Sequence, residues 1–387
     1  MSGAGEEGDD LSDDLVGVSS YEAPGRVKRK FEGWHRPRKQ YVREKQWCAQ
    51  IDTLLDELND ATELRYFGLP GSDLLDLRCF HKKVCEPRGL RLRYMGFNKG
   101  ADPGSPDLAE MTISIDEIQK LSNVDPGSLI LPDDFRLLAS DESLAWQRTA
   151  ELGPYDVINL DLCDGFGKDH GSEFNNTYYT AVSHLMTLQS RRAKPWLLLL
   201  TTRVGQEHVH KDTFDALKKN YTSNLTSCVP FREASNAHFA INDVTSLKLQ
   251  VLTAKGLQSV FLTSICKWLV ALGLAFKPAS KVEIASVMGY KVKPQATTED
   301  MVSIAIKVIP TLVAPKDPGN LAKQPVKALD ECSLASAALE EIRKLCDVDS
   351  TLAGDAVLAC QMLENMGGLL EQARYDLAEY KKWAAKH

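Results

Sequence analysis

Residues 64–69 (LRYFGL), with Pro70, Gly71 and the helix-like run at 72–80 behind them, decide the fold predicted for this chain. An apolar run that turns through a glycine-containing elbow into a helical pattern is typical of a strand that leads into a helix. Four further apolar runs also end in polar or acidic residues: LRLRYMGFN (90–98), GSLILPDDF (127–135), YDVINLDLCD (155–164) and PWLLLLTTR (195–203). We therefore expect an open, mostly parallel sheet whose strand ends line a ligand crevice.

The segments around these runs extend the same α/β pattern. Strands are expected at 64–69, 90–97, 128–131, 155–161 and 195–202, and helices at 71–86, 114–122, 133–150, 173–192 and 211–221. This alternation predicts right-handed crossovers with helices on both faces of the sheet. Beyond them lie an apolar helical stretch at 243–275 and two long strands, 281–293 and 301–313, joined by a short loop. Such a pair predicts an antiparallel hairpin at the end of the sheet.

Composition limits the classes of protein to consider. The chain has 387 residues, 43% of them hydrophobic, and a formal net charge of −7, which describes an ordinary globular protein. No apolar run reaches membrane-spanning length and the start is acidic, so we expect a cytoplasmic protein with no membrane segment. The nine cysteines lack the spacing of a disulfide framework, which suits reduced thiols. Cys79, His81 and Cys85 have no second pair at zinc spacing, so no metal site is expected.

Charge is unevenly distributed at the N-terminus. Residues 1–24 carry seven acidic residues and no Lys or Arg, whereas residues 26–46 carry nine basic residues against two acidic ones. We expect residues 1–25 to be a disordered acidic tail. Residues 26–62, here called the basic arm, are expected to end in a lead-in helix at 46–61 whose apolar residues have helical spacing.

Two main interpretations of the basic arm stay open, beside contact with another acidic partner. Its sequence FEGWHRPRKQYVREKQW (31–47) interleaves aromatic residues with basic ones, a composition that suits a nucleic-acid backbone or single strand. On this interpretation four residues contact phosphates: Arg36, Arg38, Lys39 and Arg43. On the other, Trp34, Tyr41 and Trp47 dock the arm onto the core, and its basic groups are solvated or paired with the acidic tail.

The units at 63–313, closed by a terminal hairpin, resemble the Rossmann-like fold of class I S-adenosylmethionine-dependent methyltransferases. The resemblance implies S-adenosylmethionine as the cofactor. It places Gly68 and Gly71 in the loop after the first strand, although the acid that usually precedes those glycines is missing. Asn98 stands where the family has a ribose-binding acid, and an amide can also bond a hydroxyl. Asp133, Asp134 and Phe135 suit the adenine region.

The resemblance also implies roles for two acids after the fourth strand, Asp161 and Asp164. In the amino-methylating branch an acid or Asn at this place holds the target amine, although that branch also has prolines that this chain lacks. Either carboxylate is expected to orient an amine or act as a base. The alternatives are contact with a ligand without catalysis, or capping of the next helix.

Two functions follow as expectations. The first is a methyltransferase-like protein that acts on or binds nucleic acid through the basic arm. The second is an inactive member of the fold that serves as a sensor or scaffold in a multiprotein complex. The WHRPRKQYVR segment combined with this core is similar to uncharacterised prokaryotic proteins associated with antiviral defence loci.

The C-terminal region is expected to consist of a linker at 314–329 and helices over 330–387. Its apolar residues recur at helical spacing and form an apolar face: Leu334, Ala338, Ile342, Leu345, Leu358, Met362, Leu369, Leu370 and Leu377. That face either packs on the sheet domain or meets another chain. We expect at least part of it to bind a partner or a second copy.

Overall fold

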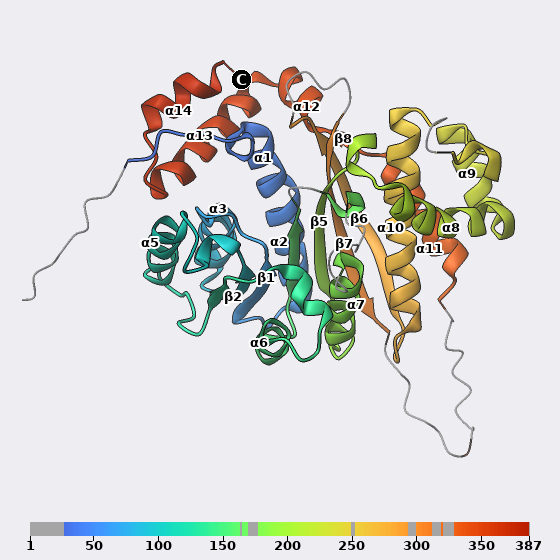
Figure 1. The fold of residues 1–387 in the computed structure, drawn as a ribbon, viewed down its shortest axis with the longest axis horizontal. Coiled ribbons are helices and arrows are strands. Elements are labelled where there is room, and N and C mark those ends of the chain that lie inside the picture. Colours follow the sequence, from blue (N-terminus) through green and yellow to red (C-terminus); the bar gives the residue numbers. More distant parts are fainter. Residues whose placement is uncertain are drawn as a thin grey trace, which may run out of the picture.

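The computed structural model describes residues 27–162, 165–168, 177–248, 252–292, 299–311, 319 and 329–386. The described residues form a mixed α/β fold around an eight-stranded sheet of order β3-β2-β1-β4-β5-β7-β6-β8 (Figure 1). The strands are β1 (Glu63–Gly68), β2 (Arg91–Phe97), β3 (Leu129–Leu131), β4 (Val157–Asp161), β5 (Trp196–Arg203), β6 (Ser280–Tyr290), β7 (Met301–Pro310) and β8 (Cys346–Asp347). The first five are parallel, and β7 runs antiparallel to both β5 and β6. The expected mostly parallel sheet with a terminal antiparallel hairpin is confirmed.

Helices cover both faces of the sheet, so each face buries its own core. One core contains residues of α2 (Ala49–Leu58), α3 (Leu75–Phe80), α5 (Leu108–Gln119) and α13 (Ala356–Gln372). The other contains residues of α7 (Tyr178–Gln189), α8 (Lys211–Ser227), α10 (Ala254–Ala275) and α11 (Glu331–Arg343). Further helices are α4 (Glu86–Arg88), α6 (Leu144–Leu152), α9 (Val229–Phe239), α12 (Val348–Gly354) and α14 (Leu377–Ala384).

The central strand β5 explains why the sheet is buried on both faces. Leu197 and Leu199 belong to the core on the side of α2, and Leu198 and Leu200 belong to the core on the side of α10. A continuous apolar run is what a parallel strand covered on both faces requires, because successive side chains point to opposite faces.

The basic arm forms a long helix that packs on the sheet. It begins with α1 (Pro37–Tyr41), continues through a π-helical segment, Val42–Cys48, and ends as α2. Pro37 occupies the first helical turn, where its missing N–H costs nothing. The buried indole of Trp47 donates to Ser303 Oγ on β7 at 3.0 Å. The helix therefore begins earlier than the predicted 46–61, and Trp47 docks the arm onto the core.

The C-terminal helices also pack on the rest of the chain. Leu334, Ala338 and Ile342 of α11 are buried in the core shared with α10, and Leu369 and Leu370 of α13 are buried in the other core. Figure 1 shows α13 beside α1, with α14 next to α13. Much of the predicted apolar face is thus covered within the chain. Contact with a partner or a second copy stays a prediction.

Two chain ends that are far apart in sequence lie side by side. The Lys28 N–H donates to the Arg374 carbonyl at 2.9 Å, and the Asp376 N–H donates to the Lys28 carbonyl at 3.0 Å. Phe31 packs its ring against the aromatic rings of Tyr375 and Trp383. The start of the described chain is therefore held by its last two helices.

Two statements drawn from the sequence were wrong: that the cysteines are reduced thiols, and that no apolar run reaches membrane-spanning length. Cys228, which caps the start of α9, forms a disulfide with Cys332 of α11, so these two cysteines are not reduced thiols. Among the described residues, one helix, α10, is long and apolar enough to cross a membrane by length and composition. An 18-residue window of this helix is 78% buried inside the structure. The expectation of a protein with no membrane segment stays a prediction.

Candidate functional site

A cavity of about 750 Å³ opens where the carboxyl ends of β1, β2, β3 and β4 meet. Its lining includes the strand-end residues Leu69, Pro70, Gly71, Phe97, Asn98, Asp133, Asp134, Phe135, Asp161 and Leu162. Parallel strands bring their carboxyl ends to one edge of the sheet, so residues spread over almost a hundred positions meet in one site. The structure thus brings together all but two of the predicted cofactor and catalytic residues: Gly71, Asn98, Asp133, Asp134, Phe135 and Asp161.

The two glycines of the first loop have different roles. Gly71 lines the cavity, and a Cβ placed on it would face open space. Gly68 ends β1 outside the cavity lining, and a Cβ placed on it would lie 2.2 Å from Tyr66 Oη. Gly68 therefore makes room for a buried tyrosine. Leu74, which follows in the loop, adopts a left-handed backbone with φ of 52° that non-glycine residues rarely accept, and such strain is concentrated at functional sites.

Asn98 holds the second strand end against the first loop. Its Nδ2 donates to the Pro70 carbonyl at 2.7 Å, and its Oδ1 accepts from the Gly100 N–H at 2.6 Å. An amide carries two N–H donors and two acceptor lone pairs, so one of each stays available toward the cavity.

Asp133 and Asp134 are adjacent but differ in their partners. The Asp134 carboxylate accepts bonds from Arg136 and pairs with Lys99 at 2.9 Å. Partial burial would raise the pKa of Asp134, but these bonds outweigh it and hold the pKa below its ordinary value. Asp133 makes no ion pair and no side-chain hydrogen bond within the described part of the chain. Asp133 is therefore the carboxylate in this region that can bind a ligand without losing an internal partner.

Asp161 is already engaged by the basic arm. Its Oδ1 lies 2.8 Å from Lys39 Nζ, and the Lys39 ammonium also lies 3.4 Å from Tyr290 Oη and 4.4 Å from the centre of the Trp47 ring. The Lys39 side chain is 3% exposed and that of Asp161 is 24% exposed. Asp164, the second predicted catalytic acid, lies outside the described residues.

The other predicted phosphate-binding residues also have internal partners. Arg43 Nε lies 2.6 Å from Asp76 Oδ1, and both side chains are buried. Arg36 donates to the Val292 carbonyl at 2.9 Å. Arg38 donates to the Lys291 carbonyl and pairs with Asp349 at 3.1 Å. The structure therefore places these basic groups, with Lys39, against the chain itself, which is the docked arrangement of the arm.

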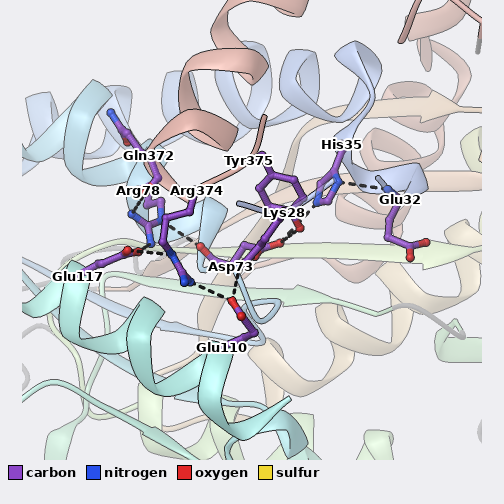
Figure 2. Close-up of polar contacts among 10 residues, drawn as sticks. All are labelled: Lys28, Glu32, His35, Asp73, Arg78, Glu110, Glu117, Gln372, Arg374 and Tyr375. Atoms are coloured by element: carbon purple, nitrogen blue, oxygen red, sulfur yellow. Dashed lines mark hydrogen bonds and ion pairs between the residues drawn. The ribbon is translucent and has the colours of Figure 1, made fainter. Parts of the chain in front are cut away.

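A polar network at the edge of the cavity joins the first loop to both ends of the described chain (Figure 2). The Asp73 carboxylate accepts from Lys28 at 2.6 Å and from the Tyr375 hydroxyl at 2.9 Å, and it lies 3.6 Å from His35 Nε2. Burial would raise the pKa of Asp73, but these donors hold the pKa far below its ordinary value. Burial lowers the pKa of His35 more than Asp73 raises it, so the imidazole is neutral at pH 7.

The network continues along α5. Arg374 pairs with Glu110 at 3.1 Å and with Glu117 at 3.0 Å, and Arg78 donates to Glu117 and to the Gln372 carbonyl. Figure 2 shows these side chains as one connected set. The loop after β1 therefore has its position fixed by α5 and by the segment between α13 and α14. Among the described residues no group of three or more His, Cys, Asp or Glu side chains could hold a metal ion.

Sequence reasoning missed Tyr290 and Asp73 as residues that shape this site, and it assigned Lys39 to a different one. Tyr290 ends β6, and only the antiparallel pairing of the hairpin brings that end to the cavity. Lys39 and Asp161 are 122 positions apart, so no local pattern signals their pairing. The one available signal was the excess of acids after the first and fourth strands near a strongly basic segment.

Comparison with known proteins gives a family for the chain but no activity. No curated protein matches it. Among solved structures, the YcgJ protein from Bacillus subtilis is similar at 12% identity and a TM-score of 0.27, covering 68% of this chain and 97% of that one. The profile described as PP_RS20740-like matches residues 28–385, which include the basic arm and the C-terminal helices. The chain therefore belongs to the PP_RS20740-like family.

Proposed function

We propose that this protein is methyltransferase-like and binds S-adenosylmethionine, or the demethylated product S-adenosylhomocysteine, in the cavity at the strand ends. The observation that carries the proposal is the strand order β3-β2-β1-β4-β5-β7-β6 together with a cavity that spans the ends of the first four strands. A mostly parallel sheet that ends in an antiparallel hairpin is what the resemblance to class I methyltransferases implies. Ligands of open α/β sheets bind at such an edge.

The residues present fit an adenosyl group. Phe97 and Phe135 offer apolar surface for the adenine, and the Asp133 carboxylate can accept a hydrogen bond from its exocyclic amine. The remaining donor and acceptor of Asn98 can bind a ribose hydroxyl. Gly71 leaves open space on the loop after β1. Bound S-adenosylmethionine would supply a methyl group on a cationic sulfur.

Calorimetric titration with S-adenosylmethionine and with S-adenosylhomocysteine tests the proposal. We expect both ligands to bind, and we expect Asp133→Asn to weaken binding by about tenfold, because a hydrogen bond to a charged group is lost. Asp116→Asn, on the outer side of α5, is the matched control and should bind as the parent does. Absence of both heat and thermal stabilisation at millimolar ligand would remove the proposal.

A second candidate, binding without methyl transfer, is favoured by a specific observation. The Asp161 carboxylate, which the resemblance assigns to a target amine, is occupied by the ammonium of Lys39. A sensor or scaffold would show ligand binding with no incorporation of labelled methyl into protein, small amines or nucleic acid. Nucleic-acid contact through the basic arm stays a prediction, and the internal partners of Arg36, Arg38, Lys39 and Arg43 weigh against it.

A further inference from the structure

The inner end of the cavity holds an amine that the chain itself provides. Lys39 reaches it from α1, whereas the groups around its ammonium come from three other elements. Asp161 ends β4, Tyr290 ends β6, and Trp47 lies in the π-helical segment. The carboxylate, the phenol and the indole face are 2.8, 3.4 and 4.4 Å from the Lys39 nitrogen, the last distance measured to the ring centre.

These groups match the chemistry of an organic ammonium ion. A carboxylate forms a charge-assisted hydrogen bond with it, a phenol oxygen accepts a second bond, and an indole face attracts the cation. Burial raises the pKa of Tyr290, so its hydroxyl stays neutral. Burying an ammonium and a carboxylate is costly, and the cost is offset only where several well-placed partners converge. This cluster provides such convergence, unlike a salt bridge on the surface.

We propose that Asp161, Tyr290 and Trp47 form a subsite for an organic ammonium group, which Lys39 fills in the described structure. The consequence of this inference for activity rests on the proposed function. The chain's own amine occupies the position where the resemblance places a target amine. An external primary amine reaches Asp161 only after Lys39 leaves. The cavity therefore binds a methyl donor without an acceptor beside it for as long as Lys39 is in place.

The protonation state of Lys39 indicates that this side chain fills the subsite and does not itself accept a methyl group. Burial lowers the pKa of Lys39, but Asp161 and Tyr290 outweigh burial and hold the pKa above its ordinary value. At neutral pH the side chain is an ammonium ion, which has no lone pair to accept a methyl group. Mass spectrometry of the purified protein should find Lys39 unmodified.

The experiment uses Lys39→Ala and n-butylammonium chloride, because the lysine side chain is a four-carbon stem that ends in an ammonium. Butylammonium at tens of millimolar should raise the melting temperature of Lys39→Ala by several degrees, as expected for a ligand that binds only the folded state. It should leave the parent and Lys39→Ala/Asp161→Asn unchanged. Butanol, which has the stem without the charge, should not stabilise any of the three.

Two outcomes would overturn the proposed subsite. Either butylammonium stabilises the parent and Lys39→Ala equally, or it does not stabilise a folded Lys39→Ala protein at all. Should Lys39→Ala fail to fold, Lys39→Met keeps the volume of the stem. Adding Asp161→Asn to Lys39→Met should then restore stability, because it removes an unpaired, partly buried carboxylate. A further loss of stability would contradict the proposal. None of these measurements uses S-adenosylmethionine. The subsite can therefore fail its test while the parent still binds S-adenosylmethionine, and the subsite can pass its test while the parent does not bind S-adenosylmethionine.

Discussion

Arg43 shows that the neighbours of a charged residue in the sequence do not predict whether its side chain is buried. It lies in a run of basic residues typical of a solvated surface, yet its guanidinium is buried 2.6 Å from Asp76. Lys39, four positions earlier, faces inward on the same side of the helix. Composition indicated the excess of positive charge correctly. The burial of these two residues depends on acids of β4 and α3, which are distant from them in sequence.

The Arg43–Asp76 pair leads to a prediction about stability. Arg43→Ala leaves the Asp76 carboxylate buried without its partner, so we expect the free energy of unfolding to fall by about 3 kcal/mol in urea titrations. Arg29→Ala, in the same arm but with a side chain that is 71% exposed, should change it by less than about 0.5 kcal/mol. A fully folded and equally stable Arg43→Ala protein that has lost affinity for nucleic acid would instead support the phosphate-binding interpretation.

Asp73 and His35 together predict lower stability in acid. His35 has a folded pKa below its ordinary value of about 6.5, so below that pH the unfolded chain binds the extra proton and stability begins to fall. Asp73 has a depressed folded pKa as well, so its contribution is present above pH of about 4 and is lost as pH decreases further.

Urea unfolding at a series of pH values checks this order. His35→Gln should reduce the fall in the free energy of unfolding between about pH 7 and 5. Asp73→Asn should reduce the fall in the free energy of unfolding below about pH 4.5. Stability that rises on acidification through either range would contradict the assigned environments.

At the scale of elements, the strands were predicted well, whereas the segments that connect them were predicted poorly. The apolar runs at 64–69 and 195–202 lie within one residue of β1 and β5 at each end, since a buried strand needs an unbroken apolar run. The helical stretch predicted at 243–275 forms an α-helix from Ala254 to Ala275, and a short 3-10 helix at Val244–Ser246 precedes it. The two-residue strand β8 and the π-helical segments have no local sequence signal.

The disulfide between α9 and α11 predicts a measurable thiol count. Denatured protein that has not been reduced should show two fewer reactive thiols than reduced protein. Cys332→Ser should lower the free energy of unfolding by about 3 to 5 kcal/mol, because the bond closes a loop over a separation of 104 residues. Cys360→Ser, at an exposed cysteine, should leave both the count difference and the stability unchanged. Identical thiol counts before and after reduction would show that the bond does not form.

At the scale of the whole molecule, the C-terminal helices were correctly predicted as amphipathic, but their packing was not specified. Helical spacing shows that an apolar face exists and not what covers it. Here α13 covers α1 and α3, and α11 covers α10 and β6. The Pro/Lys-rich linker suggested loose attachment, yet most of the apolar residues beyond it are part of the two cores.

A matched pair of substitutions on α13 separates internal packing from assembly. Leu370 is fully buried, so Leu370→Asp should cost at least about 3 kcal/mol and leave little soluble folded protein. Val357, which is 81% exposed on the same helix, should tolerate Val357→Asp. A Leu370→Asp protein that stays folded but becomes smaller in sedimentation would show that this face joins two chains.

The backbone pairing of Lys28 with the segment at 374–376 has a consequence for biosynthesis. A ribosome makes Lys28 long before the segment at 374–376, so the arm cannot complete this pairing until that segment has left the ribosome. During that interval Phe31 lacks the aromatic neighbours that later shelter it. We therefore expect the arm of the nascent chain to stay undocked until the segment at 374–376 has been made, so that docking of the arm is a late step of folding.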